Sequence, residues 1–316
     1  MTKIDCILAA SANVKTAHGG AGGESAPAFP LRGGYPGPDE VEAFRRAPGF
    51  GEAALHAAGC VAEQYRGNWA LNRLLGDRGR TLMGLAILDL HYNGGKDGGL
   101  TATRLKERCS EFGICSPGRV TAMLGALRLF GFLVEVHGGD RRVRRMRPTE
   151  KFLAVHGARR RCFLEALAGM VPEGRFALER QDDPAFAAAH VGALARMYAA
   201  GVRIVDYVPE LADAFQRDAG MLILMALTVE ARRGGGDPLA PLDMTISELA
   251  RRYSVSRGHV LSVLRAAERN GLAVRPAGRG GGIRVTGALI DAVDRFVATV
   301  LLLHVVAVRE ARAALG

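Results

Sequence analysis

The chain has 316 residues, and its 42 lysines and arginines against 32 aspartates and glutamates give a formal net charge of +10 at pH 7. Hydrophobic residues make up 48% of the sequence, which excludes a wholly disordered or fibrous protein. The length suits about two ordinary domains or one large one. A sequence pI near 9.8 favours an acidic partner, either nucleic acid or an anionic membrane surface, unless the charge has no specific role.

The sequence signals neither export nor membrane insertion. The apolar run of residues 6–10 is too short for the core of a signal peptide. The longest apolar stretch, residues 296–308, is too short to span a hydrocarbon core of ~30 Å, so it is read as a buried helix. We therefore expect a cytoplasmic protein that makes no membrane contact.

The cysteines are odd in number and scattered along the chain. This pattern does not resemble a disulfide framework, and no CxxC pair indicates zinc. Two of them flank a short insertion, where a redox switch is one reading and two ordinary buried thiols are the other. The five are Cys6, Cys60, Cys109, Cys115 and Cys162.

The N-terminal segment 1–38 is rich in glycine, alanine and proline from residue 11 onward, and we expect it to lack fixed structure. Helices are predicted at residues 39–46, 52–66 and 81–92. Trp69, the single tryptophan, lies near the start of a helix, where it is a packing anchor or, alternatively, part of an effector pocket.

Two segments carry the positive charge. Residues 101–160 hold 13 basic and 5 acidic side chains, and residues 245–286 hold 8 basic and 2 acidic ones. A genome-wide preference for arginine would spread the charge evenly, so this localisation favours a specific use such as nucleic-acid binding.

The two basic segments resemble each other, which indicates a diverged internal duplication. Each has a threonine before a short helix, a serine before a second helix, and a glycine after it. The matched pairs are Thr101 with Thr245, Leu105 with Leu249, Ser116 with Ser256, Gly118 with Gly258, Val120 with Val260, Leu124 with Leu264, and Gly131 with Gly271.

Each copy predicts three helices followed by a β-hairpin. Thr245 and Ser256 are N-caps, and Val260, Leu264 and Ala267 form an apolar stripe at helical spacing. Residues 272–275 and 283–286 are short strands around a glycine-rich tip. The first copy repeats this order, with a hairpin through residues 137–140 and a basic returning strand over 141–147. Further helices are predicted at 150–168, 184–199, around 210–217, and 287–313.

This arrangement resembles the winged helix-turn-helix domain of MarR-type bacterial transcriptional regulators. The glycine that ends the second helix, the hydrophobic strand after it, the basic wing, and the threonines Thr149 and Thr286 carry the resemblance, which covers residues 81–168 and 219–313. Residues 111–114 depart from the second copy. The predicted fold is mainly α-helical with small β-hairpin wings: tandem winged domains on a helical bundle, divided at 1–38, 39–178 and 179–316.

The resemblance implies an intrachain pseudo-dimer, with a homodimer also open, that presents two different recognition helices to double-stranded DNA. We expect an asymmetric operator with half-sites ~34 Å apart. Arg257 and His259 are the favoured base contacts, and the wing arginines suit phosphates or a narrow minor groove. The candidate DNA-binding residues are Ser116, Arg119, Thr121, Arg128, Arg141, Arg142, Arg144, Arg145, Ser256, Arg257, His259, Ser262, Arg265, Arg279 and Arg284.

A second class of function stays open, because the first recognition helix exposes Ala122, Gly125 and Ala126 and offers few polar groups. In that alternative the winged domains bind protein and act as a scaffold without specific DNA binding. No catalytic constellation, phosphate loop or metal-ligand spacing is present, so we expect no enzymatic activity, no cofactor and no metal. His304 is expected in the core or an interface, and an unidentified small-molecule effector is implied by resemblance only.

Overall fold

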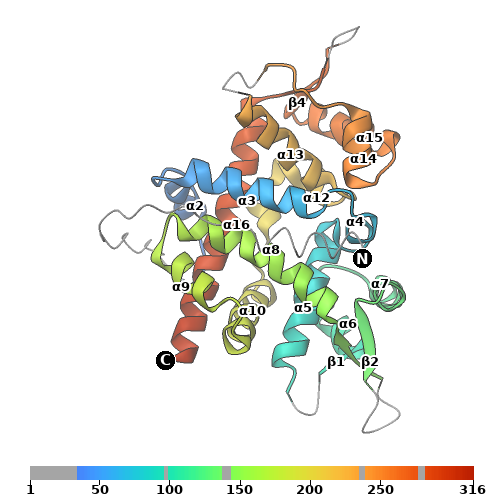
Figure 1. Cartoon of the computed structure of the whole chain (residues 1–316), viewed down its shortest axis with the longest axis vertical. Helices are drawn as coiled ribbons and strands as arrows, with labels where there is room; N and C mark the ends of the chain where they lie inside the picture. Colours follow the sequence, from blue (N-terminus) through green and yellow to red (C-terminus); the bar gives the residue numbers. More distant parts are fainter. Residues whose placement is uncertain (1–33, 96–98, 137–143, 235–238, 277–281) are drawn as a thin grey trace.

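The computed structural model describes residues 34–95, 99–136, 144–234, 239–276 and 282–316. The fold is mainly α-helical with small antiparallel sheets (Figure 1). In the part of the chain that is described, no helix is both long and apolar enough to cross a membrane. The candidate residues Arg141, Arg142 and Arg279 lie outside the described residues.

A first unit, residues 38–168, runs from α2 to α8. Its helices are α2 (Pro38–Arg45), α3 (Phe50–Gln64), α4 (Trp69–Leu75), α5 (Arg78–Asn93), α6 (Ala102–Glu111), α7 (Pro117–Leu129) and α8 (Glu150–Ala168). Its strands are β1 (Leu100–Thr101), β2 (Leu133–Val136) and β3 (Arg145–Pro148), in the antiparallel order β1-β3-β2.

A second unit, residues 172–315, has a similar order of elements, without a counterpart of β1 and with three short helical segments in the place of α4. Its helices are α9 (Pro172–Arg180), α10 (Pro184–Ala199), α11 (Ile204–Tyr207), a 3-10 turn at Pro209–Leu211, α12 (Ala212–Phe215), α13 (Gly220–Arg233), α14 (Ile246–Tyr253), α15 (Arg257–Arg269) and α16 (Gly287–Leu315). Its strands β4 (Ala273–Val274) and β5 (Arg284–Val285) form one antiparallel pair.

The same hydrogen bond occurs once within each unit, between a threonine and a glycine. Thr149 Oγ1 donates to the carbonyl of Gly131, and Thr286 Oγ1 donates to that of Gly271, each over 2.8 Å. Both glycines adopt a φ of 69°, which a residue with a Cβ adopts only at a cost. The threonine thus ties the start of the long helix to the end of the helix before the hairpin, once in each unit.

The repeat extends beyond the segments that resemble each other in sequence. Proline opens both α2 and α9, and the helix after each is of similar length. The packing is reciprocal: α3 contacts α8 of its own unit and α13 of the other, whereas α10 contacts α16 of its own unit and α5 of the other. Likewise α2 packs on α16 and α9 packs on α8. The predicted boundary after residue 178 falls inside α9, which contacts α8 of the first unit and α16 of the second.

Helix α16 runs through the middle of the molecule and along its long axis (Figure 1). Leu301, Leu302 and Val305 are fully enclosed, and the predicted apolar helix of residues 296–308 lies within this longer helix. Burial of such side chains stabilises a fold by about 1.5–3 kcal/mol each. The second unit thereby joins one core with the first.

Most predicted helices are present within a few residues of their expected bounds. The segments 150–168 and 184–199 form α8 and α10, and Trp69 begins α4. The insertion at 111–114 makes a turn with Gly113 at a φ of +61°. The short helix expected around 210–217 is a 3-10 turn followed by α12.

The cysteine pattern predicted no disulfide framework, and this prediction is wrong for one pair of cysteines. Cys60 of α3 and Cys162 of α8 form a disulfide across 102 residues of sequence. The count and spacing of cysteines could not show this pairing, because it depends on the packing of α3 against α8. Cys109 and Cys115 are free thiols, and burial raises the pKa of Cys109 to about 12, which disfavours a reactive thiolate.

Candidate nucleic-acid interface

Helices α7 and α15 hold the largest group of candidate residues. The Oγ atoms of Ser116 and Ser256 cap them by accepting hydrogen bonds from the backbone N–H groups of Arg119 and His259. The apolar stripe of each helix is buried, as Val120 and Val260 illustrate, so the opposite face points outward. Figure 1 shows both helices along the same side of the molecule, with α4 between them and the strands β2 and β4 toward opposite ends.

On α15 the candidate residues fall into two groups. Arg257 and Arg265 are exposed, and no carboxylate pairs with either of them within the described residues. His259 Nε2 lies 2.7 Å from the carbonyl oxygen of Asp218, and Ser262 Oγ accepts a 2.6 Å hydrogen bond from Arg217. The two arginines are therefore available to a partner, whereas His259 and Ser262 are held against the segment before α13.

On α7 the candidate side chains are mostly engaged within the chain. Arg119 pairs with Asp77 at 2.8 Å and Arg128 pairs with Glu135 at 2.7 Å, although both arginines are about half exposed. Thr121 Oγ1 donates to the carbonyl of Pro117 over 3.1 Å. Because the acidic partners neutralise its arginines, α7 offers less free positive charge than α15.

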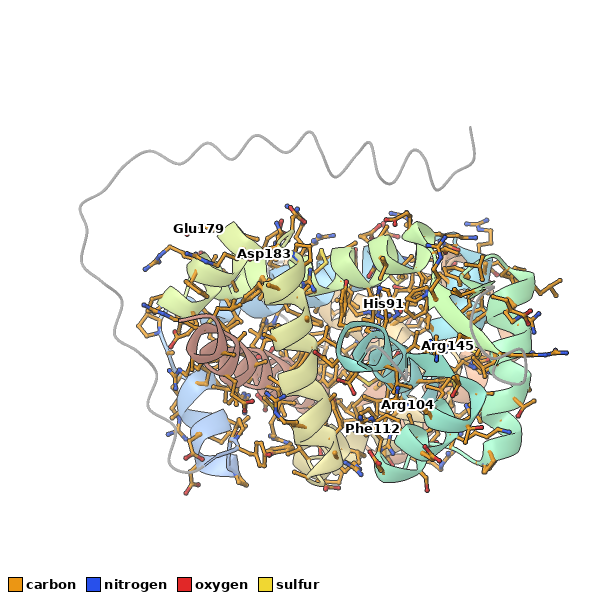
Figure 2. The ribbon with its side chains drawn as sticks, turned by 90° about the horizontal axis from the view of Figure 1, so that it is seen from below. His91, Arg104, Phe112, Arg145, Glu179 and Asp183 are labelled. Atoms are coloured by element: carbon orange, nitrogen blue, oxygen red, sulfur yellow. A yellow bond between two sulfur atoms is a disulfide. The ribbon has the colours of Figure 1, made fainter. Side chains whose placement is uncertain are left out.

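The hairpins contribute differently in the two units. Arg144 is exposed before β3, and Arg145 is half-buried on that strand opposite Val136. Arg284 on β5 donates to the carbonyl of Leu239 over 3.2 Å. Viewed from below, Arg104 and Arg145 lie on the opposite side from Glu179 and Asp183, which belong to the start of the second unit (Figure 2).

One functional contact escaped the sequence reasoning. Asp218 lies between the units, where its carboxylate pairs with Arg80 at 2.8 Å and Arg73 at 3.2 Å, while its backbone carbonyl contacts His259. The adjacent Ala219 N–H donates to the carbonyl of Gly76. This loop therefore links α15 of the second unit to α4 and α5 of the first. No spacing signal in the sequence marks it, because each of these partners is more than 40 residues away in the chain.

A cavity of about 270 Å³ lies between the two units. Its walls are mainly apolar and come from α5, α8, α10, α13 and α16, with Leu85, Leu153 and Phe296 as examples. This volume and character are typical of a small-molecule site. The charged side chains that line it are Arg78, Arg159, Arg160, Arg203 and Asp77.

The guanidinium of Arg159 is the most distinctive group in this cavity. It lies over the ring of Tyr65, 5.1 Å from the centroid, and within the described residues it has no carboxylate partner. Burial lowers the pKa of Arg159 to about 10, so the side chain still carries its charge at neutral pH. The one carboxylate in the wall, Asp77, is already paired with Arg80 and Arg119. The cavity consequently favours an anion.

Three histidines complete the polar wall. His304 Nδ1 and His190 Nε2 lie 3.1 Å apart, and His156 packs on Phe152. Burial lowers the pKa of His156 to about 4 and that of His304 to about 3, and it lowers that of His190 as well. All three are therefore neutral near pH 7, as expected for His304 in a core or interface.

In comparisons with known proteins, no family model, no curated protein and no solved structure matches the chain.

Proposed function

We propose that the chain is a transcriptional regulator that binds double-stranded DNA through two winged helix-turn-helix units of MarR-like type. In this proposal α7 and α15 are recognition helices, the hairpins are wings, and the two fused units act as a pseudo-dimer on an asymmetric operator with two half-sites. The observation that carries it is the repeated helix–helix–hairpin unit, which places two outward-facing helices along one side of the molecule (Figure 1). No catalytic step and no cofactor belong to the proposal, and its expected place of action is the cytoplasm.

The difference between the two helices supports an asymmetric operator. Arg257 and Arg265 of α15 are exposed and have no acidic partner within the described residues, so they suit base edges or phosphates. Arg119 must first break its ion pair with Asp77 before it can contact DNA, and the free energy lost there offsets part of the free energy of DNA binding. We therefore expect α15 to read its half-site with greater specificity than α7.

Selection of bound sequences from a random duplex pool tests this proposal, and enrichment of two unlike half-sites is the expected result. Arg257→Ala and Arg265→Ala are each expected to weaken binding to the selected site about tenfold, because each removes one contact worth about 1–3 kcal/mol. Arg46→Ala, which removes an exposed charge beyond the end of α2, is the matched control and leaves affinity unchanged. A salt titration separates the two kinds of contact, because loss of a phosphate contact flattens the dependence of affinity on salt concentration and loss of a base contact does not.

A protein-binding role is the second candidate, and one surface favours it. Leu129 at the end of α7 is 82% exposed and Trp69 is 52% exposed, with the Trp69 ring 5.5 Å from that of Phe130. Exposed apolar groups of this size often mark a protein interface. If the duplex pool yields no enriched sequence at any salt concentration, DNA reading is excluded and this alternative takes its place.

The cavity gives the expected effector a location. An apolar organic anion fits its walls and the guanidinium of Arg159, which has no carboxylate partner among the described residues, and binding there bridges both units. We expect apolar carboxylic acids to raise the melting temperature of the protein. Arg159→Met is expected to weaken their affinity about tenfold, because the ion pair with the carboxylate is lost. Arg175→Met, which removes an exposed charge on α9, is the control; equal responses in both variants place the ligand elsewhere.

A further inference from the structure

Four side chains with metal-binding chemistry meet on the seam between α3 and α8. His56 and Cys60 lie one turn apart on α3, and Cys162 and Glu165 lie one turn apart on α8. Residues spaced by three or four positions share one helix face, so both pairs point to the seam. His56 Nε2 is 3.2 Å from Glu165 Oε2. One ligand atom from each of His56, Cys60 and Glu165 fits within 4.8 Å of the others.

We propose that reduction of the Cys60–Cys162 disulfide converts this seam into a Zn²⁺ site with two cysteines, one histidine and one glutamate as ligands. The reductant is a dithiol: it passes two electrons and two protons to the disulfide, becomes a cyclic disulfide itself, and leaves two Cys thiols. Zn²⁺ then binds the two sulfurs, which lose their protons to solvent. In the reverse direction a cyclic disulfide takes two electrons from the two thiolates and two protons from solvent and becomes a dithiol, while the Cys60–Cys162 bond re-forms and Zn²⁺ is released. Metal and disulfide therefore exclude each other.

The geometry agrees with tetrahedral zinc. Bonds of about 2.0–2.1 Å to nitrogen and oxygen place those two atoms about 3.3 Å apart on a tetrahedral edge. The observed His56–Glu165 distance of 3.2 Å already matches that edge. Three of the four groups already lie together, and in the proposed site the sulfur of Cys162, whose Cα is 5.7 Å from that of Cys60, turns about χ1 to take the fourth corner.

Access and charge also suit the ion. The side chains of His56 and Glu165 are 47% and 36% exposed, whereas Cys162 is buried beneath them. The ion thus reaches the seam from solvent and meets sulfur ligands at its base. Histidine and thiolate donors select zinc over magnesium or calcium, which prefer oxygen. His190 is the seventh residue of α10, as His56 is of α3, but the position one turn later is Leu194, so the second unit has no such pair on α10.

The test uses the full-length, tag-free chain in its reduced and oxidised forms, with Zn²⁺ as the probe. Competition with a chromophoric chelator measures affinity, and Co²⁺ in place of Zn²⁺ reports thiolate ligands through a charge-transfer band. We expect one tightly bound ion per reduced chain and none in the oxidised chain. Cys60→Ser and Cys162→Ser are expected to abolish tight binding, and His56→Ala and Glu165→Gln to weaken it at least tenfold.

Matched controls keep the assignment falsifiable. The double variant Cys109→Ser/Cys115→Ser removes the other free thiol pair and is expected to bind zinc like the wild type. Circular dichroism of each metal-free variant shows that it is folded before titration. The proposal is overturned if the reduced chain binds no zinc more tightly than Cys60→Ser does, if His56→Ala leaves affinity unchanged, or if the Cys109/Cys115 variant loses the ion.

Discussion

Asp294→Ala is expected to lower the free energy of unfolding by about 3 kcal/mol, since it leaves the guanidinium of Arg232 without its carboxylate partner in a site that is largely shielded from water. Asp294 on α16 is 8% exposed and accepts a hydrogen bond from Arg232 of α13. Urea unfolding at pH 7 measures the change. Glu310→Ala on the same helix is the control: it breaks an exposed pair with Arg196 and is expected to cost under about 1 kcal/mol.

The intact Arg232–Asp294 pair is expected to contribute little to the free energy of unfolding, because burial removes both charges from water. Burial raises the pKa of Asp294 above its ordinary value, although Arg232 opposes the shift. Burial of the carboxylate therefore offsets much of what the guanidinium contributes, so the intact pair adds little to stability even though removal of one partner is costly. We accordingly expect the double variant Arg232→Met/Asp294→Leu to be within about 1 kcal/mol of the wild type or above it. A double variant as unstable as Asp294→Ala contradicts this account.

The sequence predicted local structure well, because local chemistry sets it. Thr101, Ser116, Thr245 and Ser256 each accept the backbone N–H three residues on, as expected of N-caps. The burial of Val120 and Val260 follows from their helical spacing. Such signals lie within a few residues of the feature they predict, so a single sequence suffices to find them.

What the sequence could not predict depends on contacts across long distances in the chain. The pairing of Arg119 with Asp77, of His259 with Asp218, and of Cys60 with Cys162 arises only when the units pack. The sequence predicted that the exposed face of α7 is poor in polar groups. It did not predict that acidic neighbours pair with the arginines of this helix. The match of α2 and α3 to α9 and α10 was also missed, since little beyond an opening proline and one histidine marks it.

The central cavity follows the same rule. It is lined from both units, and no stretch of sequence holds more than part of its wall. Arg159 and Arg160 look like ordinary members of a basic run, yet packing places both at a cavity between the units. The charge of residues 101–160 is therefore divided: part of it faces solvent near α7 and β3, and part of it is enclosed.

Acid is expected to destabilise the fold through the cavity histidines, and His304→Gln is expected to remove a defined part of that effect. The pKa of His304 is about 3 in the folded chain, against an ordinary value of 6.5, so the unfolded chain takes up a proton that the folded chain refuses. Stability is therefore full above about pH 6.5 and falls as pH decreases toward the folded-state pKa. Between pH 7 and pH 5 this single group costs about 2 kcal/mol.

The measurement is urea unfolding of wild type and His304→Gln at both pH values. Glutamine keeps a polar group beside His190 but does not titrate, so the variant should lose about 2 kcal/mol less than the wild type on acidification. Thr299→Val, one turn earlier on α16, removes a buried hydroxyl and is expected to shift stability equally at both pH values. The physical cause is burial, reinforced by the nearby charge of Arg160. If His304→Gln and the wild type lose the same stability on acidification, His304 is hydrated and the wall of the cavity is open to water at that end.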